Sequence, residues 1–130
     1  MKKIFHIFFI SFFLNLIWEN LHAFLYAGYK GGEITQFILF RASLGDAVMI
    51  TLLALPFFFI PSLKKWSWLI IILGVLLAVY IEWYALGAGR WAYNAYMPII
   101  PFLNVGLTPT IQLGLLGYVS YRVVERKEKI

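Results

Sequence analysis

Side chains that can carry charge interrupt segments of this 130-residue chain that are otherwise apolar enough to cross a membrane. They are Glu19, His22, Arg41, Asp46 and Glu82. An unpaired charge near the centre of a membrane helix costs about 2.5 to 3.5 kcal/mol. The four of these groups that are normally charged are Arg41 and the three acids, and left unpaired they would together cost roughly 10 to 14 kcal/mol. That sum is comparable with the whole net stability of an ordinary domain. These groups must therefore pair, titrate or bind a ligand.

The composition is that of an integral membrane protein. Apolar residues make up 62% of the chain and charged residues only 13%, a balance that a soluble domain of this length does not show. Four apolar segments, at about residues 4–26, 34–60, 66–86 and 107–124, are each close to the ~20 residues that cross a bilayer core. We therefore predict an all-α fold in which residues 1–130 form a single transmembrane domain, a four-helix bundle.

Most basic residues flank one side of these spans, eight of the eleven in the chain. They are Lys2, Lys3, Lys64, Lys65, Arg122, Arg126, Lys127 and Lys129. Because Lys and Arg in short loops stay mainly in the cytoplasm, both termini are predicted to be cytoplasmic. Topology and anionic lipids then explain the positive net charge, and no nucleic-acid partner is expected.

The first segment also resembles a secretory signal peptide, since Lys2 and Lys3 precede an apolar run. Cleavage after Ala23 would place Leu21 where a small residue is normally required. We therefore expect this segment to be retained as the first transmembrane helix. The chain has no cysteine, which excludes thiolate chemistry, disulfides and cysteine-ligated metal sites.

With four spans and cytoplasmic termini, the polar groups converge towards the outer leaflet. Asn15, Glu19 and His22 are spaced by four and three residues, so they share one face of the first helix. Arg41 is expected to reach across to Glu19 or Glu82, and Gly45 is expected to permit a close helix approach. The predicted ligand-binding residues are Glu19, His22, Arg41, Asp46, Glu82, Arg90, Asn94 and Gln112, with Asp46 and Glu82 as candidate catalytic acids or bases.

Counting charges leaves this site one negative charge in excess, because three carboxylates face two arginines. A protonated His22, a carboxyl that keeps its proton, a bound metal or a cationic ligand could each neutralise it. Glu19 and His22 have the Glu-x-x-His spacing of di-iron bundles. A single copy of that spacing is common, however, and pairing of His22 with a carboxylate is the simpler interpretation. No metal and no cofactor are therefore expected.

The segment between the third and fourth spans is rich in aromatic residues. Trp91, Tyr93 and Tyr96 suit the membrane interface, while residues 97–107 are too apolar for a hydrated loop and contain two prolines that exclude a regular helix. Two interpretations stay open. The segment is either a re-entrant lid over the polar site or an interfacial loop that only joins two helices.

Several short motifs are spread over most of the chain. They are Arg41-Ala42-Ser43-Leu44-Gly45-Asp46, Glu82-Trp83, Arg90-Trp91-Ala92-Tyr93, Met97-Pro98 and Gly106-Leu107-Thr108-Pro109 with Gln112. In these the chain resembles a group of small uncharacterised bacterial integral membrane proteins. The resemblance implies a four-helix, multi-pass fold in the bacterial inner membrane. It implies no reaction, ligand or catalytic residue.

Three functions follow as alternatives. In the first, the site near the outer leaflet binds, and as an enzyme would also transform, a lipid-like or small polar ligand. In the second, the chain is a small proton-coupled transporter that works as a homo-oligomer, with Glu19 as the coupled group. In the third, it is an accessory or assembly subunit of a partner membrane protein, and the charge network is purely structural.

The distribution of polar residues favours the first alternative. The cytoplasmic halves of the spans offer almost no polar lining for a transport pathway, and a structural network seldom needs five ionisable groups at one depth. Membrane lipids are the expected surroundings in every case. Whether the chain is an enzyme stays open.

Overall fold

The computed structural model describes residues 2–128, with side-chain surroundings given up to Arg126. The basic side chains of Lys127 and Lys129, which entered the orientation argument, lie outside that description. Four helices follow one another along the chain, α1 (Lys2–His22), α2 (Gln36–Phe59), α3 (Leu69–Gly87) and α4 (Leu107–Glu128). Two short 3-10 helices, η1 (Ala23–Leu25) and η2 (Pro61–Trp66), extend α1 and join α2 to α3.

Three of the described helical segments are long and apolar enough to cross a membrane, namely Lys2–Leu25, Gln36–Phe59 and Leu69–Gly87. The first three predicted apolar helices are thereby confirmed. Helix α4 forms where the fourth apolar helix was predicted. Over its described residues, however, it is not apolar enough to be counted with the other three as a helix that could cross a membrane. Gln112, Ser120 and Arg122 lower its hydropathy, so the fourth span stays a prediction.

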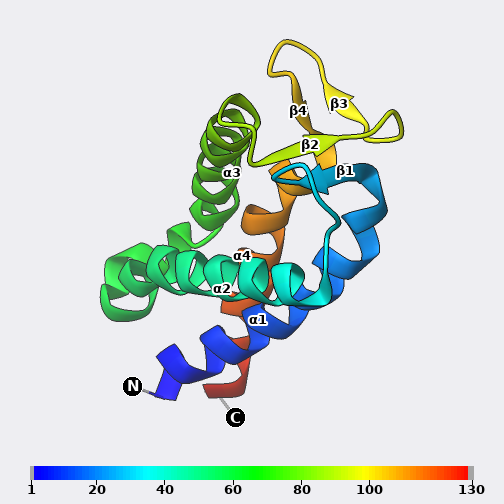
Figure 1. Ribbon diagram of the computed structural model, residues 1–130. Coiled ribbons are helices and arrows are strands. Elements are labelled where there is room, and N and C mark those ends of the chain that lie inside the picture. The colour runs from blue at the N-terminus through cyan, green and yellow to red at the C-terminus, as the bar shows by residue number, and fades with distance from the viewer. Residues whose placement is uncertain (1, 129–130) are drawn as a thin grey trace.

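Helix α4 lies at the centre of the molecule and contacts the other three helices (Figure 1). Helix α1 packs mainly against α2, and α3 packs mainly against α4. Both chain ends lie at one end of the molecule, whereas the strands lie at the other (Figure 1). At the terminal end, Lys3 Nζ lies 3.0 Å from Glu125 Oε1, which joins the first turn of α1 to the end of α4.

The contact between α3 and α4 depends on glycine. A Cβ atom on Gly74 would lie 2.5 Å from the Cα atom of Gly114, and a Cβ atom on Gly114 would overlap the carbonyl oxygen of Ile71. Only glycine lets these two backbones approach so closely. The prediction that Gly45 has this role was wrong, because a Cβ atom there meets no described atom within 4 Å.

The apolar core occupies the terminal half of the bundle. Its buried members are Ile7, Ile50, Ala54, Phe57, Phe58, Ile70, Ala78, Leu113, Leu116, Tyr121 and Val124. They come from all four helices. The polar side chains of the predicted site therefore have to gather in the other half, towards the strands.

The all-α prediction missed two small antiparallel sheets at that end. Strand β1 (Tyr26–Tyr29) pairs with β2 (Trp91–Tyr93), and β3 (Ile99–Ile100) pairs with β4 (Val105–Gly106). Strands of two to four residues leave no periodic pattern in a sequence. Their pairing also depends on the helices, because α1 and α3 bring β1 and β2 together (Figure 1).

The segment that was predicted to be either a re-entrant lid or an interfacial loop forms the β3–β4 hairpin. Trp83 of α3 donates a hydrogen bond from Nε1 to the carbonyl oxygen of Leu103, at 2.7 Å, and so holds the hairpin beside the helix. Phe102 at the tip is completely exposed and has a φ of 70°, which is unusual for a bulky residue. Whether the hairpin re-enters a membrane stays a prediction.

Candidate functional site

Gln112 is the centre of a buried polar cluster to which α1, α2 and α4 contribute. Its amide nitrogen lies 2.8 Å from Asn15 Oδ1, 2.9 Å from Glu19 Oε1 and 3.0 Å from Asp46 Oδ2. An amide nitrogen carries two protons, so it cannot donate fully to three acceptors. All three are satisfied when one carboxyl group also carries a proton and shares it with the other. The cluster is therefore a place where a proton can be held between two acids.

The first helix supplies three of the cluster's side chains from one face, as its spacing predicted. Asn15 is oriented by its own amide, which donates to the carbonyl oxygen of Ser11 at 2.7 Å. His22 lies 3.2 Å from Glu19 Oε2 through Nε2, and 2.8 Å from Thr108 Oγ1 through Nδ1. The two oxygens of Glu19 thus face His22 and the Gln112 amide inside the protein, so this carboxyl group has polar contacts that do not involve an arginine.

Glu82 lies in a separate aromatic setting. Its Oε1 atom accepts hydrogen bonds from Tyr93 OH at 2.5 Å, from Tyr26 OH at 3.4 Å and from Trp91 Nε1 at 3.4 Å. Burial raises the pKa of both tyrosines above its ordinary value, and the nearby carboxylate raises it further. The phenols therefore remain protonated and able to donate. The backbone N–H of Gly106 donates to Tyr93 OH at 3.0 Å, which joins this group to α4.

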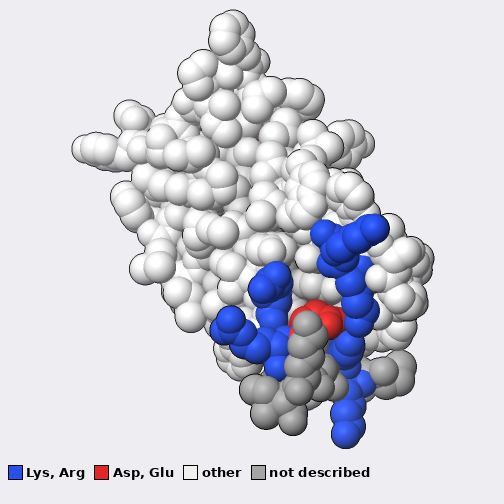
Figure 2. Space-filling view, turned by 180° about the vertical axis from the view of Figure 1, so that it is seen from behind, with Lys and Arg blue, Asp and Glu red and all other residues white. Residues whose placement is uncertain are grey.

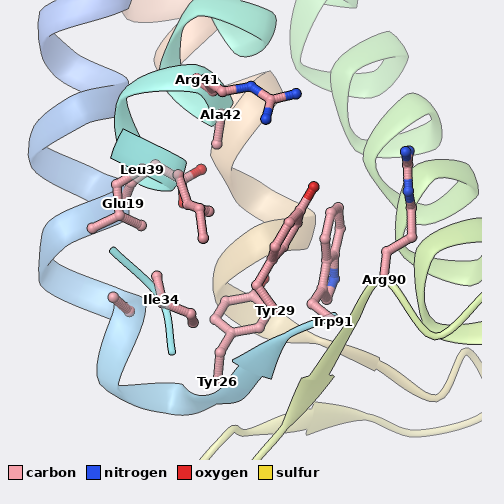
Figure 3. A pocket seen from close by; sticks show the side chains of 11 residues that line it. Glu19, Tyr26, Tyr29, Ile34, Leu39, Arg41, Ala42, Arg90 and Trp91 are labelled. Carbon is pink, nitrogen blue, oxygen red and sulfur yellow. The ribbon is translucent and has the colours of Figure 1, made fainter. Parts of the chain in front are cut away.

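A cavity of about 260 Å³ opens between the first half of α2 and the β1–β2 sheet (Figure 3). It is lined by Glu19, Ala23, Tyr26, Tyr29, Ile34, Ile38, Leu39, Arg41, Ala42, Arg90 and Trp91. Tyr29 and Trp91 stack in its wall with ring centres 6.4 Å apart. Figure 3 shows Arg41 extending above these two rings and Arg90 standing on the far side of Trp91 from Glu19. The cavity thus has an acid on one side, aromatic rings in the middle and two guanidinium groups at its border.

The two arginines contact aromatic rings. The Arg41 guanidinium lies 5.8 Å from the centre of the Phe37 ring, and that of Arg90 lies 5.9 Å from the centre of the Tyr84 ring. Among the described side chains, neither arginine forms an ion pair with a carboxylate. The prediction that Arg41 pairs with Glu19 or Glu82 was therefore wrong. Arg41 occupies the exposed side of α2, whereas those acids face the interior.

The predicted site residues fall into three places. Glu19, His22, Asp46 and Gln112 form one cluster, Glu82 lies in the aromatic setting, and Arg41 and Arg90 border the cavity. Asn94 belongs to none of them, because its amide donates to the carbonyl oxygen of Phe24 at 2.5 Å and holds the loop against η1. Glu19 alone of the eight both belongs to the cluster and lines the cavity.

Three residues of the site were not predicted from the sequence, namely Tyr26, Tyr29 and Thr108. Helical spacing could have indicated Thr108, because it lies four residues before Gln112 and so on the same face of α4. Nothing local could have indicated the two tyrosines. They reach the site because β1 pairs with a strand that follows α3.

Within residues 2–128, no three His, Asp or Glu side chains gather in a way that could hold a metal ion. The Glu19 and His22 pair of the Glu-x-x-His motif is instead joined by the hydrogen bond described above. The side chains gathered at the site carry carboxyl, imidazole, phenol and guanidinium groups, which can take part in acid and base chemistry and in anion binding.

The architecture defines a helical protein with three helices that could cross a membrane and with a polar site at one end of its bundle. No protein-family model matches the chain, and comparisons with the curated proteins and with the solved structures also found no match. Its function must therefore be argued from the geometry of the site.

Proposed function

We propose that this protein binds an anionic amphiphile, a molecule with a phosphate or carboxylate head and an apolar chain, in the cavity bordered by Arg41 and Arg90. One observation carries the proposal. Two guanidinium groups border one cavity without a carboxylate partner among the described residues. The acid that lines the same cavity, Glu19, contacts His22 and Gln112 rather than either arginine.

Charge favours an anion in this cavity. Arginine presents a planar fork that matches phosphate and carboxylate oxygens. An arginine near hydrocarbon is costly unless it meets a partner or reaches water. A bound anionic head would supply that partner for both arginines at once, which a protein carboxylate does not do here.

The size of the cavity favours a head group over a whole molecule. Pockets that enclose a drug-sized ligand usually measure roughly 300 to 1,000 Å³, and this cavity is about 260 Å³. It would therefore accommodate the head and the first atoms of a chain. The apolar wall formed by Ile34, Ile38 and Leu39 offers that chain a path along α2 towards lipid.

The proposal includes a membrane topology. We place α4 as a fourth span and both termini in the cytoplasm of a bacterial cell, with the protein as a multi-pass component of the inner membrane. The basic residues near the two chain ends support that orientation. The cavity would then open near the outer leaflet, where an amphiphile can enter sideways from the bilayer.

If the bound molecule is also transformed, Glu19 is the acid or base to which we assign proton transfer. It lines the cavity, whereas Asp46 and Glu82 do not. His22 contacts Glu19 directly, and Gln112 contacts both Glu19 and Asp46. His22 and Asp46 are therefore the groups that would take up or return the proton.

The test uses farnesyl monophosphate, with farnesol as the probe that has the same chain and no anion. Binding to the detergent-solubilised protein is measured by native mass spectrometry and calorimetry. Arg41→Gln and Arg90→Gln should each weaken binding of the phosphate about tenfold or more, since hydrogen bonds to charged groups contribute ~1.5 to 3 kcal/mol. Lys65→Gln is the matched control, because it also removes one positive charge, and Lys65 is exposed and does not line the cavity. Equal binding of farnesol and its phosphate, or equal loss in the control, would refute the proposal.

A second function is favoured by the closure of the polar cluster. The carboxylates of Glu19 and Glu82 have internal donors, so the network could serve only to fix helix register in an accessory subunit. In that case Arg41→Gln and Arg90→Gln would leave all ligand binding unchanged. Glu19→Gln would instead lower the amount of folded protein and its association with a partner.

A further inference from the structure

A second cavity, of about 280 Å³, lies at the end of the molecule that carries the chain termini. It is formed by η2, the residue that follows it and the last turns of α4, and it is lined by Lys64, Ser67, Tyr121, Arg122, Glu125 and Arg126. Figure 2 shows Lys and Arg side chains gathered around acidic atoms at this end, while the rest of the visible face carries no charged side chain. The cavity is thus separate from the site described above and has a different composition.

Positive charge is in excess around this cavity. Glu125 is the one acidic residue among its described lining side chains, and it is shared by Lys3 Nζ at 3.0 Å and Lys64 Nζ at 3.6 Å. A single carboxylate can balance only one of those lysines. Arg122 contacts a neutral group, the hydroxyl of Tyr118, at 3.4 Å. The surplus therefore requires an anion from outside the described chain or from solvent.

The start of α3 adds to this positive potential. Trp68 occupies the N-cap position of the helix and no side chain caps it. Ser67, directly before it, lines the cavity. The N-terminus of a helix carries roughly half a positive charge, which favours a phosphate. The N–H groups of Ile70 and Ile71 already donate to the carbonyl oxygens of Ser67 and Trp68, so this contribution comes from the helix dipole. Two independent features, the basic side chains and the helix start, therefore meet at one cavity.

The surroundings of the cavity indicate a lipid. Trp66 and Trp68 are 45% and 44% exposed, and tryptophan is typical of the membrane interface. The exposed apolar residues Ile71, Ile72 and Leu73 follow in the first turns of α3. A molecule whose head lies in the cavity would thus find apolar surface next to it for its chains.

We propose that this cavity binds the phosphate head group of an anionic phospholipid in the leaflet on the side of the chain termini. The lipid would hold η2, the start of α3 and the end of α4 together, as Glu125 already does for Lys3 and Lys64. This site is independent of the proposed amphiphile cavity near the strands.

The experiment compares palmitoyl-oleoyl phosphatidylglycerol, phosphatidylcholine with the same chains, and inorganic phosphate, each added to the detergent-solubilised protein and followed by native mass spectrometry. The double variant Arg122→Gln with Arg126→Gln removes two charges from the cavity. The matched control, Lys2→Gln with Lys65→Gln, removes two charges from the same end outside the lining. At about fivefold per basic residue, the first double variant should bind phosphatidylglycerol roughly 30-fold more weakly than the wild type.

The wild type should also prefer phosphatidylglycerol over phosphatidylcholine, and inorganic phosphate should compete only weakly because it lacks the chains. Equal losses in the two double variants would overturn the proposal, since they would indicate attraction to net charge alone. A wild type without preference between the two lipids would overturn it as well, as would binding of phosphate without binding of lipid. If circular dichroism shows that the double variant is unfolded, Arg126→Gln is compared with Lys65→Gln by the same measure.

Discussion

Replacement of Gln112 by Met tests whether the polar cluster holds the bundle together. Methionine is close to glutamine in length and volume, and both are good helix formers, so the change removes the amide without leaving a large cavity. The amide has two protons and faces Asn15, Glu19 and Asp46. The substitution therefore removes two hydrogen bonds and leaves buried acceptors unsatisfied.

The expected loss of stability has two parts, the hydrogen bonds that are removed and the buried acceptors that are left without a donor. Side-chain hydrogen bonds between membrane helices average about 0.6 kcal/mol and reach about 1.7, so two of them give roughly 1 to 3.5 kcal/mol. A buried acceptor left without a donor costs about 1 to 3 kcal/mol, and more when it is charged. Asn15 is completely buried and Gln112 is 4% exposed, so little water can replace the amide. We therefore expect a loss of about 2 to 5 kcal/mol in the free energy of unfolding.

The assay is reversible unfolding in dodecyl sulfate mixed micelles, followed by the fluorescence of the five tryptophans and by circular dichroism. Gln36→Met is the matched control. Gln36 donates to Asn20 Oδ1 at 2.8 Å, but both residues are exposed, so water replaces the bond and the change should stay within about 0.5 kcal/mol. If the two variants differ by less than that margin, the cluster does not stabilise the bundle and the reasoning is refuted.

Two further changes test the packing and the aromatic setting. Gly114→Ala places a Cβ atom against the backbone of Ile71 and should lower the free energy of unfolding by about 1 to 3 kcal/mol. Gly45→Ala is the control, because its Cβ atom meets no neighbour, and it should raise the free energy of unfolding by up to ~1 kcal/mol. A similar melting temperature for both variants would contradict the close approach of α3 and α4. The pKa of Tyr93 is raised above 10.0 in the folded protein by burial and by Glu82, so the folded state keeps a proton that the unfolded chain loses. The stability that the raised pKa of Tyr93 contributes is therefore fully present below pH 10 and declines as the pH rises above that value. Tyr93→Phe should make the decline of stability above pH 10 less steep, as measured by fluorescence-monitored unfolding at several pH values, and an unchanged slope would contradict the assignment.

The helices and one face of the site can be predicted from the sequence. Runs of apolar residues of membrane length can be read locally, because an α-helix satisfies its own backbone hydrogen bonds within the segment. The shared face of Asn15, Glu19 and His22 follows in the same way from helical spacing, and the structure places these three around one cluster with Gln112. The charge surplus near the chain ends is also a property of the sequence alone.

Which side chains meet across helices depends on the tertiary structure. Arg41 was expected near an acid but lies on the exposed side of α2, and its place at the cavity depends on how β1 and β2 pair. The roles of Gly74 and Gly114, and the lack of one for Gly45, likewise depend on which helices cross at these glycines. The physical reason is the same in each case. Helical spacing sets the direction of a side chain on its own helix, whereas the order and rotation of neighbouring helices result from packing of the whole bundle.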